Sequence, residues 1–176
     1  MKAIILLALW WAATLTLRAQ NVGVTEILSQ SVDCCNQGLV CAQAVEVTQT
    51  GMVSSISYYT FASGGGQMVL GVYDSAGPSG GPGNLLAATE AFTVADNSWN
   101  TTPVRGSGAI LVPGTYWLAY QVTSNDTRFP INRTTGAIDV AQWLRFGSPL
   151  PSPFPPLSIS QLQAEWSFYI TLVPVR

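Results

Sequence analysis

The residues with the clearest potential for binding chemistry lie in one polar run around Trp99. An indole ring can stack on the apolar C–H face of a sugar, while nearby amides and carboxylates hydrogen-bond its hydroxyls. Asp96, Asn97 and Asn100 supply such groups beside Trp99, and Trp143 is the second candidate. A tryptophan packed beneath a strand end would give the same local pattern, so the sequence leaves both interpretations open.

Catalysis is not expected from this composition. The 176 residues include no histidine, which excludes Ser-His-Asp hydrolysis and histidine-ligated zinc. The nine Asp and Glu residues are scattered and form no recognisable acid–base pair. With seven Lys and Arg residues and a net charge of −2, the chain also lacks the basic cluster that nucleic-acid binding requires. We therefore expect a protein that is not an enzyme, does not bind nucleic acid and acts by contact.

Cofactors are not expected either, with a structural calcium ion as the alternative. Calcium binds several oxygen ligands at once. Oxygen-bearing side chains lie at the loop-like positions Asp74, Asp96, Asn97, Asn125 and Asp126. None of them belongs to a calcium-binding loop motif, and Asx turns explain them equally well.

The chain contains three cysteines, Cys34, Cys35 and Cys41. We predict a disulfide between Cys41 and either Cys34 or Cys35, because residues 36–38 between them can form the turn of a short closed loop. The third thiol would then be buried or would pair with another chain. No metal site is predicted, because adjacent cysteines cannot readily present both sulfurs to one tetrahedral ion.

Residues 1–19 have the layout of a helical secretory signal peptide. Lys2 precedes an apolar stretch over residues 3–13, and the segment closes on the small residue Ala19. That stretch is shorter than the roughly 20 residues that a membrane-spanning helix needs. We predict cleavage after Ala19 and a secreted or cell-surface chain, residues 20–176, with no membrane span. An uncleaved N-terminal anchor is the alternative.

The elements that position these residues are predicted to be β-strands. Short runs rich in Val, Ile, Thr, Tyr and Phe are separated by Gly, Pro, Asn and Asp, and no stretch keeps the apolar period of an amphipathic helix. Strands are expected at residues 22–29, 43–49, 52–61, 67–73, 86–94, 99–104, 109–112, 115–123, 138–146 and 166–173. The sequence therefore predicts an all-β fold, an antiparallel β-sandwich of about 8–10 strands in a single domain, residues 20–176.

Alternation within two of these strands predicts which side chains face the core. Tyr116, Leu118, Tyr120 and Val122 share one face of their strand, with Trp117, Ala119 and Gln121 on the other. In the last strand the inward residues are expected to be Trp166, Phe168, Ile170 and Leu172.

Glycine, proline and sequon patterns predict loops. Residues 76–84 and the proline-rich residues 146–157 are expected to lie outside the sheets. Asn100, Asn125 and Asn132 begin N-glycosylation acceptor patterns, which favour exposed loops.

Four segments carry a resemblance to a known group of domains. They are residues 69–74 (VLGVYD), 80–87 (GGPGNLLA), 98–101 (SWNT) and 111–119 (LVPGTYWLA). Together they resemble a recurrent secreted bacterial jelly-roll domain, similar to galactose-binding-like and carbohydrate-binding-module sandwiches. The resemblance covers roughly residues 45–173 and implies a jelly-roll sandwich that is non-catalytic.

Two functions fit these expectations. The leading hypothesis is a secreted module whose loops or concave face bind a glycan or another cell-surface ligand. The alternative is a structural subunit of an extracellular fibre, sheath or matrix that forms homo-oligomers by strand addition, with residues 21–29 as the donor.

Overall fold

The structure is a computed structural model that describes residues 18–133, 139–143, 149–156 and 164–175. For residues 139–143 it describes the backbone alone. It is all-β, as the sequence predicts: the described residues contain fourteen strands, which pair antiparallel in three sheets. The one helical element in them is the short 3-10 turn η1 (Pro78–Gly80), and no helix there is long and apolar enough to cross a membrane. Most of the predicted signal peptide, residues 1–17, lies outside the described part.

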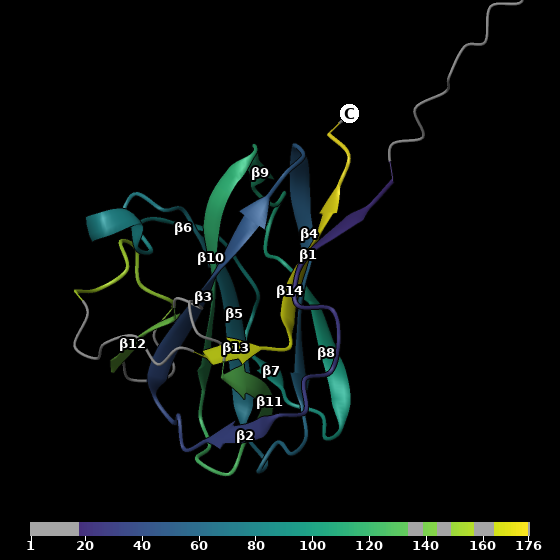
Figure 1. Cartoon of the computed structure of the whole chain (residues 1–176), viewed down its shortest axis with the longest axis vertical. Helices are drawn as coiled ribbons and strands as arrows, with labels where there is room; N and C mark the ends of the chain where they lie inside the picture. Colours follow the sequence, from purple (N-terminus) through teal and green to yellow (C-terminus); the bar gives the residue numbers. More distant parts are fainter. Residues whose placement is uncertain (1–17, 134–138, 144–148, 157–163, 176) are drawn as a thin grey trace, which may run out of the picture.

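The first sheet has the strand order β1-β14-β4-β8, with β9 paired to the start of β4. Its strands are β1 (Gln20–Gly23), β14 (Phe168–Val173), β4 (Gly51–Thr60), β8 (Ser98–Pro103) and β9 (Ile110–Leu111). In Figure 1 this sheet occupies the right side of the molecule. Strand β1 begins directly after the predicted cleavage position.

The second sheet has the order β12-β3-β10-β5-β6, with β7 paired to β5. Its strands are β12 (Asp139–Trp143), β3 (Leu39–Val47), β10 (Gly114–Val122), β5 (Gln67–Tyr73), β6 (Leu85–Ala88) and β7 (Phe92–Thr93). It lies on the left in Figure 1, so the two larger sheets form the layers of a sandwich.

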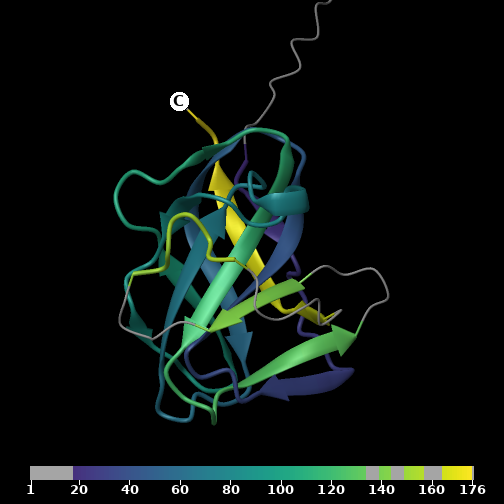
Figure 2. The same ribbon diagram turned by 90° about the vertical axis from the view of Figure 1, so that its left-hand side faces the viewer.

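A third, smaller sheet crosses one end of the sandwich. It consists of β13 (Ala164–Trp166), β11 (Arg128–Arg133) and β2 (Ser31–Cys34), in that order. Figures 1 and 2 both show β2 and β11 running across the lower end, at a steep angle to the longer strands. Arg128 also pairs with Ala62, just after β4, which ties this sheet to the first one.

The main hydrophobic core lies between the sheets. In β10, Leu118, Tyr120 and Val122 face this core, whereas Trp117 and Ala119 face the opposite side, as the alternation predicts. The predicted inward residues of β13 and β14 lie in the same core. These contacts confirm the β-sandwich; its jelly-roll connectivity stays a prediction.

The outer side of the second sheet is covered by residues 149–156. Leu150 and Phe154 pack with Tyr73 and Trp117 in a second apolar cluster. The Tyr73 and Phe154 rings meet edge to face with centroids 5.1 Å apart, and the Tyr73 hydroxyl donates a hydrogen bond of 2.8 Å to the Pro151 carbonyl. The described part of the proline-rich segment thus lies outside the sheets, as predicted, and seals one face of the sandwich.

Candidate functional site

The outer side of the first sheet carries an aromatic cluster formed by Tyr59, Phe61, Trp99 and Tyr169. Tyr59 lies on β4, Phe61 just after it, Trp99 on β8 and Tyr169 on β14. The register pairs Trp99 with Tyr59 and places Tyr169 across from Ser57. Because residues of one strand alternate between its two sides, these rings face away from the main core.

Edge-to-face contacts fix the rings of the aromatic cluster. The Trp99 ring centroid lies 5.5 Å from that of Tyr59 and 4.9 Å from that of Tyr169, at interplanar angles of 75° and 62°. Tyr59 contacts Phe61 in the same way at 5.7 Å. Tyr59 is 7% exposed, whereas Trp99, Phe61 and Tyr169 are half-buried. The cluster therefore presents held rings, partly open to solvent.

The turn before Trp99 supplies polar groups next to these rings. The Tyr59 hydroxyl donates a hydrogen bond of 2.8 Å to Asn97 Oδ1, and Asn97 has a left-handed φ of 48°. The Asp96 carboxylate accepts a hydrogen bond of 2.6 Å from the Ser63 backbone N–H. Hydrogen bonding with Ser63 lowers the pKa of Asp96, so the carboxylate is charged at neutral pH. Asp96 and Asn97 are both exposed and so accessible to a ligand.

Hydroxyl and amide groups continue the same face along the sheet. The Ser57 and Thr101 hydroxyls are hydrogen-bonded at 2.9 Å across β4 and β8. Farther along, the Thr171 hydroxyl donates to Asn21 Oδ1, also at 2.9 Å. The face thus joins aromatic rings at one end to neutral polar groups along its length.

Asn100, predicted as a ligand contact, is a structural residue instead. It is 7% exposed on β8. Its Oδ1 accepts from the Ala95 N–H at 2.8 Å, and its Nδ2 donates to Thr60 Oγ1 at 3.0 Å and to the carbonyls of Ala95 and Ser98. The alternation that turns Trp99 outward turns Asn100 inward, so the expectation of an exposed loop at this sequon was wrong.

Trp143 lies far from the aromatic cluster. It ends β12, an edge strand of the second sheet, where it pairs with Leu39. Trp99 lies on β8, at an edge of the first sheet, and Figure 1 places the two strands on opposite sides of the molecule. The Trp143 side chain lies outside the described structure, so its role stays a prediction.

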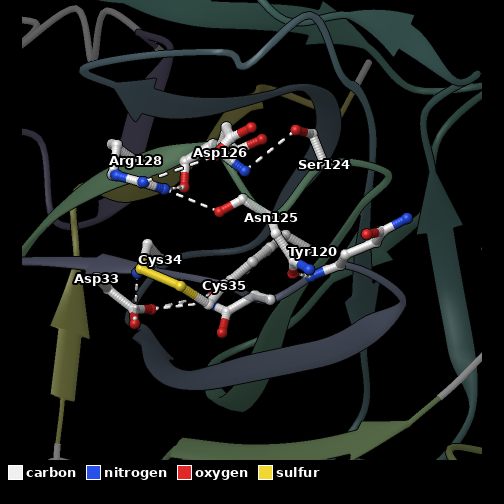
Figure 3. Close-up of a disulfide and its surroundings, with 11 residues drawn as sticks. Asp33, Cys34, Cys35, Tyr120, Ser124, Asn125, Asp126 and Arg128 are labelled. Carbon is white, nitrogen blue, oxygen red and sulfur yellow. Dashed lines mark hydrogen bonds and ion pairs between the residues drawn. A yellow bond between two sulfur atoms is a disulfide. The ribbon is translucent and has the colours of Figure 1, made fainter.

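The disulfide joins Cys34 to Cys35, not Cys41 to either of them. Cys41 lies near the start of β3, with its fully buried side chain in the main core and Tyr120 opposite it on β10. Cys34 ends β2 and Cys35 follows it (Figure 3); Cys34 is half-buried and Cys35 is exposed. The predicted pairing was wrong because the pleat of β3 directs the Cys41 side chain between the sheets. The third thiol is therefore that of Cys41, and it is buried, which is one of the two outcomes predicted for it.

Asp33 forms a hydrogen-bonding centre beside the disulfide that the sequence did not reveal. Its carboxylate accepts from the Cys34 N–H at 2.9 Å, the Asn36 Nδ2 at 2.8 Å and the Trp166 Nε1 at 3.0 Å. The Asn36 amide also donates to the Tyr120 hydroxyl at 2.8 Å. Cys34 and Asn36 are close to Asp33 in the chain, whereas Trp166 and Tyr120 come from distant strands that no local motif marks. The arrangement anchors the β2–β3 connection to the core.

Among the described residues, no three His, Cys, Asp or Glu side chains lie close enough together to hold a metal ion. Among the loop oxygens, the Asp74 carboxylate accepts from the N–H groups of Ala76 and Asn84 and from the Asn84 side chain, an Asx-type turn. A structural calcium ion at the other positions stays a prediction.

A cavity of about 460 Å³ lies between residues 76–84 and residues 153–156. Prolines, glycines and Phe154 form most of its walls, and none of its lining residues is charged. The two walls are joined by hydrogen bonds from the Phe154 N–H to the Gly83 carbonyl at 2.6 Å and from the Leu85 N–H to Ser152 Oγ at 3.1 Å. The cavity thus lies beside residues 149–156, which cover the outer side of the second sheet.

Comparison with known proteins places the chain in no family. No protein-family model matches the sequence, and no curated protein is significantly similar to it.

Proposed function

We propose that this protein is a secreted, non-catalytic β-sandwich module that binds a glycan through the aromatic cluster and the Asp96–Asn97 turn. The observation that carries the proposal is the half-buried Trp99 ring, held by Tyr59 and Tyr169 beside exposed polar groups.

The chemistry of this face matches that of a sugar. The apolar C–H face of a pyranose stacks on an aromatic ring, and its hydroxyls accept and donate hydrogen bonds. Asp96 offers an acceptor, Asn97 an amide, and Thr101 a hydroxyl on the same outer face. Rings already fixed by their neighbours lose little conformational freedom on binding, which favours affinity.

Glycan binding by Trp99→Ala is the direct test. The purified chain would be applied to a glycan array and to insoluble polysaccharides, and hits would be measured by titration calorimetry. We expect Trp99→Ala to weaken binding at least about tenfold, because the stacking surface is lost. No glycan bound by the wild-type chain, or unchanged affinity in Trp99→Ala, would overturn the proposal.

Tyr116→Ala is the matched control. Tyr116 is also half-buried and lies on a strand, but near the start of β10, where neighbouring Gly114 pairs with Val47. Trp99 lies near the opposite end of the long strands, where β8 pairs with the end of β4. Tyr116→Ala is therefore expected to keep wild-type affinity.

Export is a further part of the proposal. Removal of residues 1–19 would leave Gln20, the first residue of β1, as the new N-terminus. N-terminal sequencing of the exported chain tests this directly: a sequence starting QNVG supports cleavage after Ala19, and one starting at Met1 contradicts it.

Strand addition stays the alternative proposal. Residues 21–23 of the predicted donor region already pair with β14 of the same chain, so donation would require β1 to leave its own sheet. Filaments in electron micrographs of the purified chain would favour this alternative over glycan binding.

A further inference from the structure

We propose that the Cys34–Cys35 disulfide is a thiol-exchange site that controls the conformation of the β2–β3 connection. Three observations support it: the accessibility of the disulfide, the charge across from it, and the left-handed backbone that it closes. The proposal is independent of glycan binding.

The disulfide is open to attack from one side. Cys35 is exposed and Cys34 is half-buried at the end of β2, whereas Cys41 is fully buried. Access and thiolate character decide which sulfurs exchange. A small thiol can therefore reach Cys35 Sγ in the folded protein and cannot reach Cys41.

The exchange has two steps. A small-molecule thiolate attacks Cys35 Sγ, the Cys34–Cys35 bond breaks, and its electron pair leaves on Cys34 Sγ, giving a mixed disulfide on Cys35. A second thiolate attacks the small-molecule sulfur of that mixed disulfide and releases Cys35 as a thiolate. Both cysteine thiolates take up protons, so two small thiols are oxidised to their disulfide and the protein disulfide is reduced to two thiols.

Arg128 is the cationic residue that the strand register pairs with Cys34. The antiparallel register places it directly across from Cys34, and such pairs have their side chains on the same face. Its guanidinium donates to the Asn125 carbonyl at 2.8 Å and lies 3.7 Å from Asp126 Oδ1 (Figure 3). A nearby cation stabilises a leaving thiolate.

Reduction releases a constrained segment. Cys35 has a φ of 67°, in the left-handed region that non-glycine residues rarely adopt, and the ring closed by the disulfide limits its backbone. In this conformation the N–H groups of Cys35 and Gln37 donate to the Asn125 carbonyl and Asn125 Oδ1, at 3.3 and 3.1 Å. Once the ring opens, Cys35 can return to negative φ, and these bonds weaken.

Differential alkylation tests the exchange. The folded chain would be treated with glutathione, alkylated with iodoacetamide and analysed by mass spectrometry, with Cys41 as internal reference. We expect Cys34 and Cys35 to be alkylated at least about 100-fold faster than Cys41. Equal rates at all three cysteines, or no labelling of Cys34 and Cys35, would overturn the proposal. Arg128→Gln should slow the labelling about threefold, and Arg128→Lys should retain the wild-type rate.

Amide hydrogen exchange tests the conformational control. We expect the Cys35 and Gln37 amides to exchange at least about tenfold faster in the reduced chain, and amides in the middle of β10 to keep their rates. The double variant Cys34→Ser, Cys35→Ser should reproduce the reduced pattern without reductant. Identical exchange in the oxidised and reduced chains would show that the disulfide controls nothing.

Discussion

The two outer faces of the sandwich both carry aromatic residues, but these residues differ in how far they are buried. The second sheet presents Trp117 and Tyr73, and the proline-rich segment covers them with Leu150 and Phe154. The first sheet presents the aromatic cluster, in which Tyr59 is buried and Phe61, Trp99 and Tyr169 are half-buried. One face forms a second apolar core, and the other keeps rings that are half-buried.

The difference comes from a segment distant in sequence. Trp117 and Trp99 both lie on strands and both point away from the main core. Trp117 is 3% exposed because residues 149–156 fold back over it, and its Nε1 donates to the Gly80 carbonyl at 3.0 Å. The burial of an aromatic residue on an outer face therefore depends on the distant segment that packs over it.

Replacing the tryptophans separates the two faces most strongly. Trp117→Ala should lower the free energy of unfolding by about 4 kcal/mol, because it opens a cavity beneath the cover. Trp99→Ala should cost about 1.5 kcal/mol, chiefly its contacts with Tyr59 and Tyr169. Urea unfolding followed by fluorescence measures both. Equal costs would mean that the face of the first sheet is as much a core as that of the second.

Removing the cover should have the next largest effect. Phe154→Ala should cost about 3 kcal/mol, because the ring packs edge to face on Tyr73. Phe61→Ala, in the half-buried aromatic cluster, is the matched control and should cost about 1 kcal/mol. A smaller loss for Phe154→Ala than for Phe61→Ala in urea unfolding would contradict the assignment of residues 149–156 as a structural cover.

A contrast within one turn is expected to be smaller. Asn100→Ala should cost about 2 kcal/mol, because the Ala95 N–H loses its acceptor and the buried Thr60 hydroxyl loses one of its two partners. Asn97→Ala, three positions away and exposed, should cost less, about 1 kcal/mol, because the Tyr59 hydroxyl loses its acceptor and alanine disfavours the left-handed backbone there. Thermal unfolding measures the loss of stability in both variants. A larger loss for Asn97→Ala than for Asn100→Ala would contradict the structural role of Asn100.

Strand alternation made much of the fold predictable. The faces of β10 and β14 follow directly from the sequence, and β5 has the predicted bounds. Two strands were missed, β2 and β11. β11 contains Pro130, which has no N–H to donate to a sheet. On the side of β13, only residues 131–133 of β11 are paired.

The site was only partly predictable, because its parts meet through long-range pairing. The polar run identified Trp99, Asn97 and Asp96, but Tyr59 and Tyr169 come from distant strands whose register no local pattern gives. The burial of Cys41 did leave a signal. Leu39, Cys41 and the later odd-numbered residues of β3 alternate as a core face, which a strand predicted to start at residue 43 overlooked.

The smallest effect concerns one hydroxyl under the cover. Tyr73→Phe removes the hydrogen bond to the Pro151 carbonyl and should cost about 1 kcal/mol at neutral pH. Tyr169→Phe, on the open face, should cost less than about 0.5 kcal/mol. Urea unfolding of both variants measures the difference. Equal losses of stability would show that the hydrogen bond from the Tyr73 hydroxyl to the covering segment does not stabilise the fold.

The difference in stability between the wild-type protein and Tyr73→Phe should also depend on pH. Burial raises the pKa of Tyr73, whereas the unfolded chain releases this proton near pH 10. The contribution of the protonated phenol to stability is therefore complete below about pH 10 and is lost as the pH rises further. Because Tyr73→Phe has no such proton, the wild-type advantage should be constant from about pH 8 to about pH 10 and should shrink between about pH 10 and about pH 11. A constant difference over that range would place the Tyr73 hydroxyl in solvent and so contradict the cover.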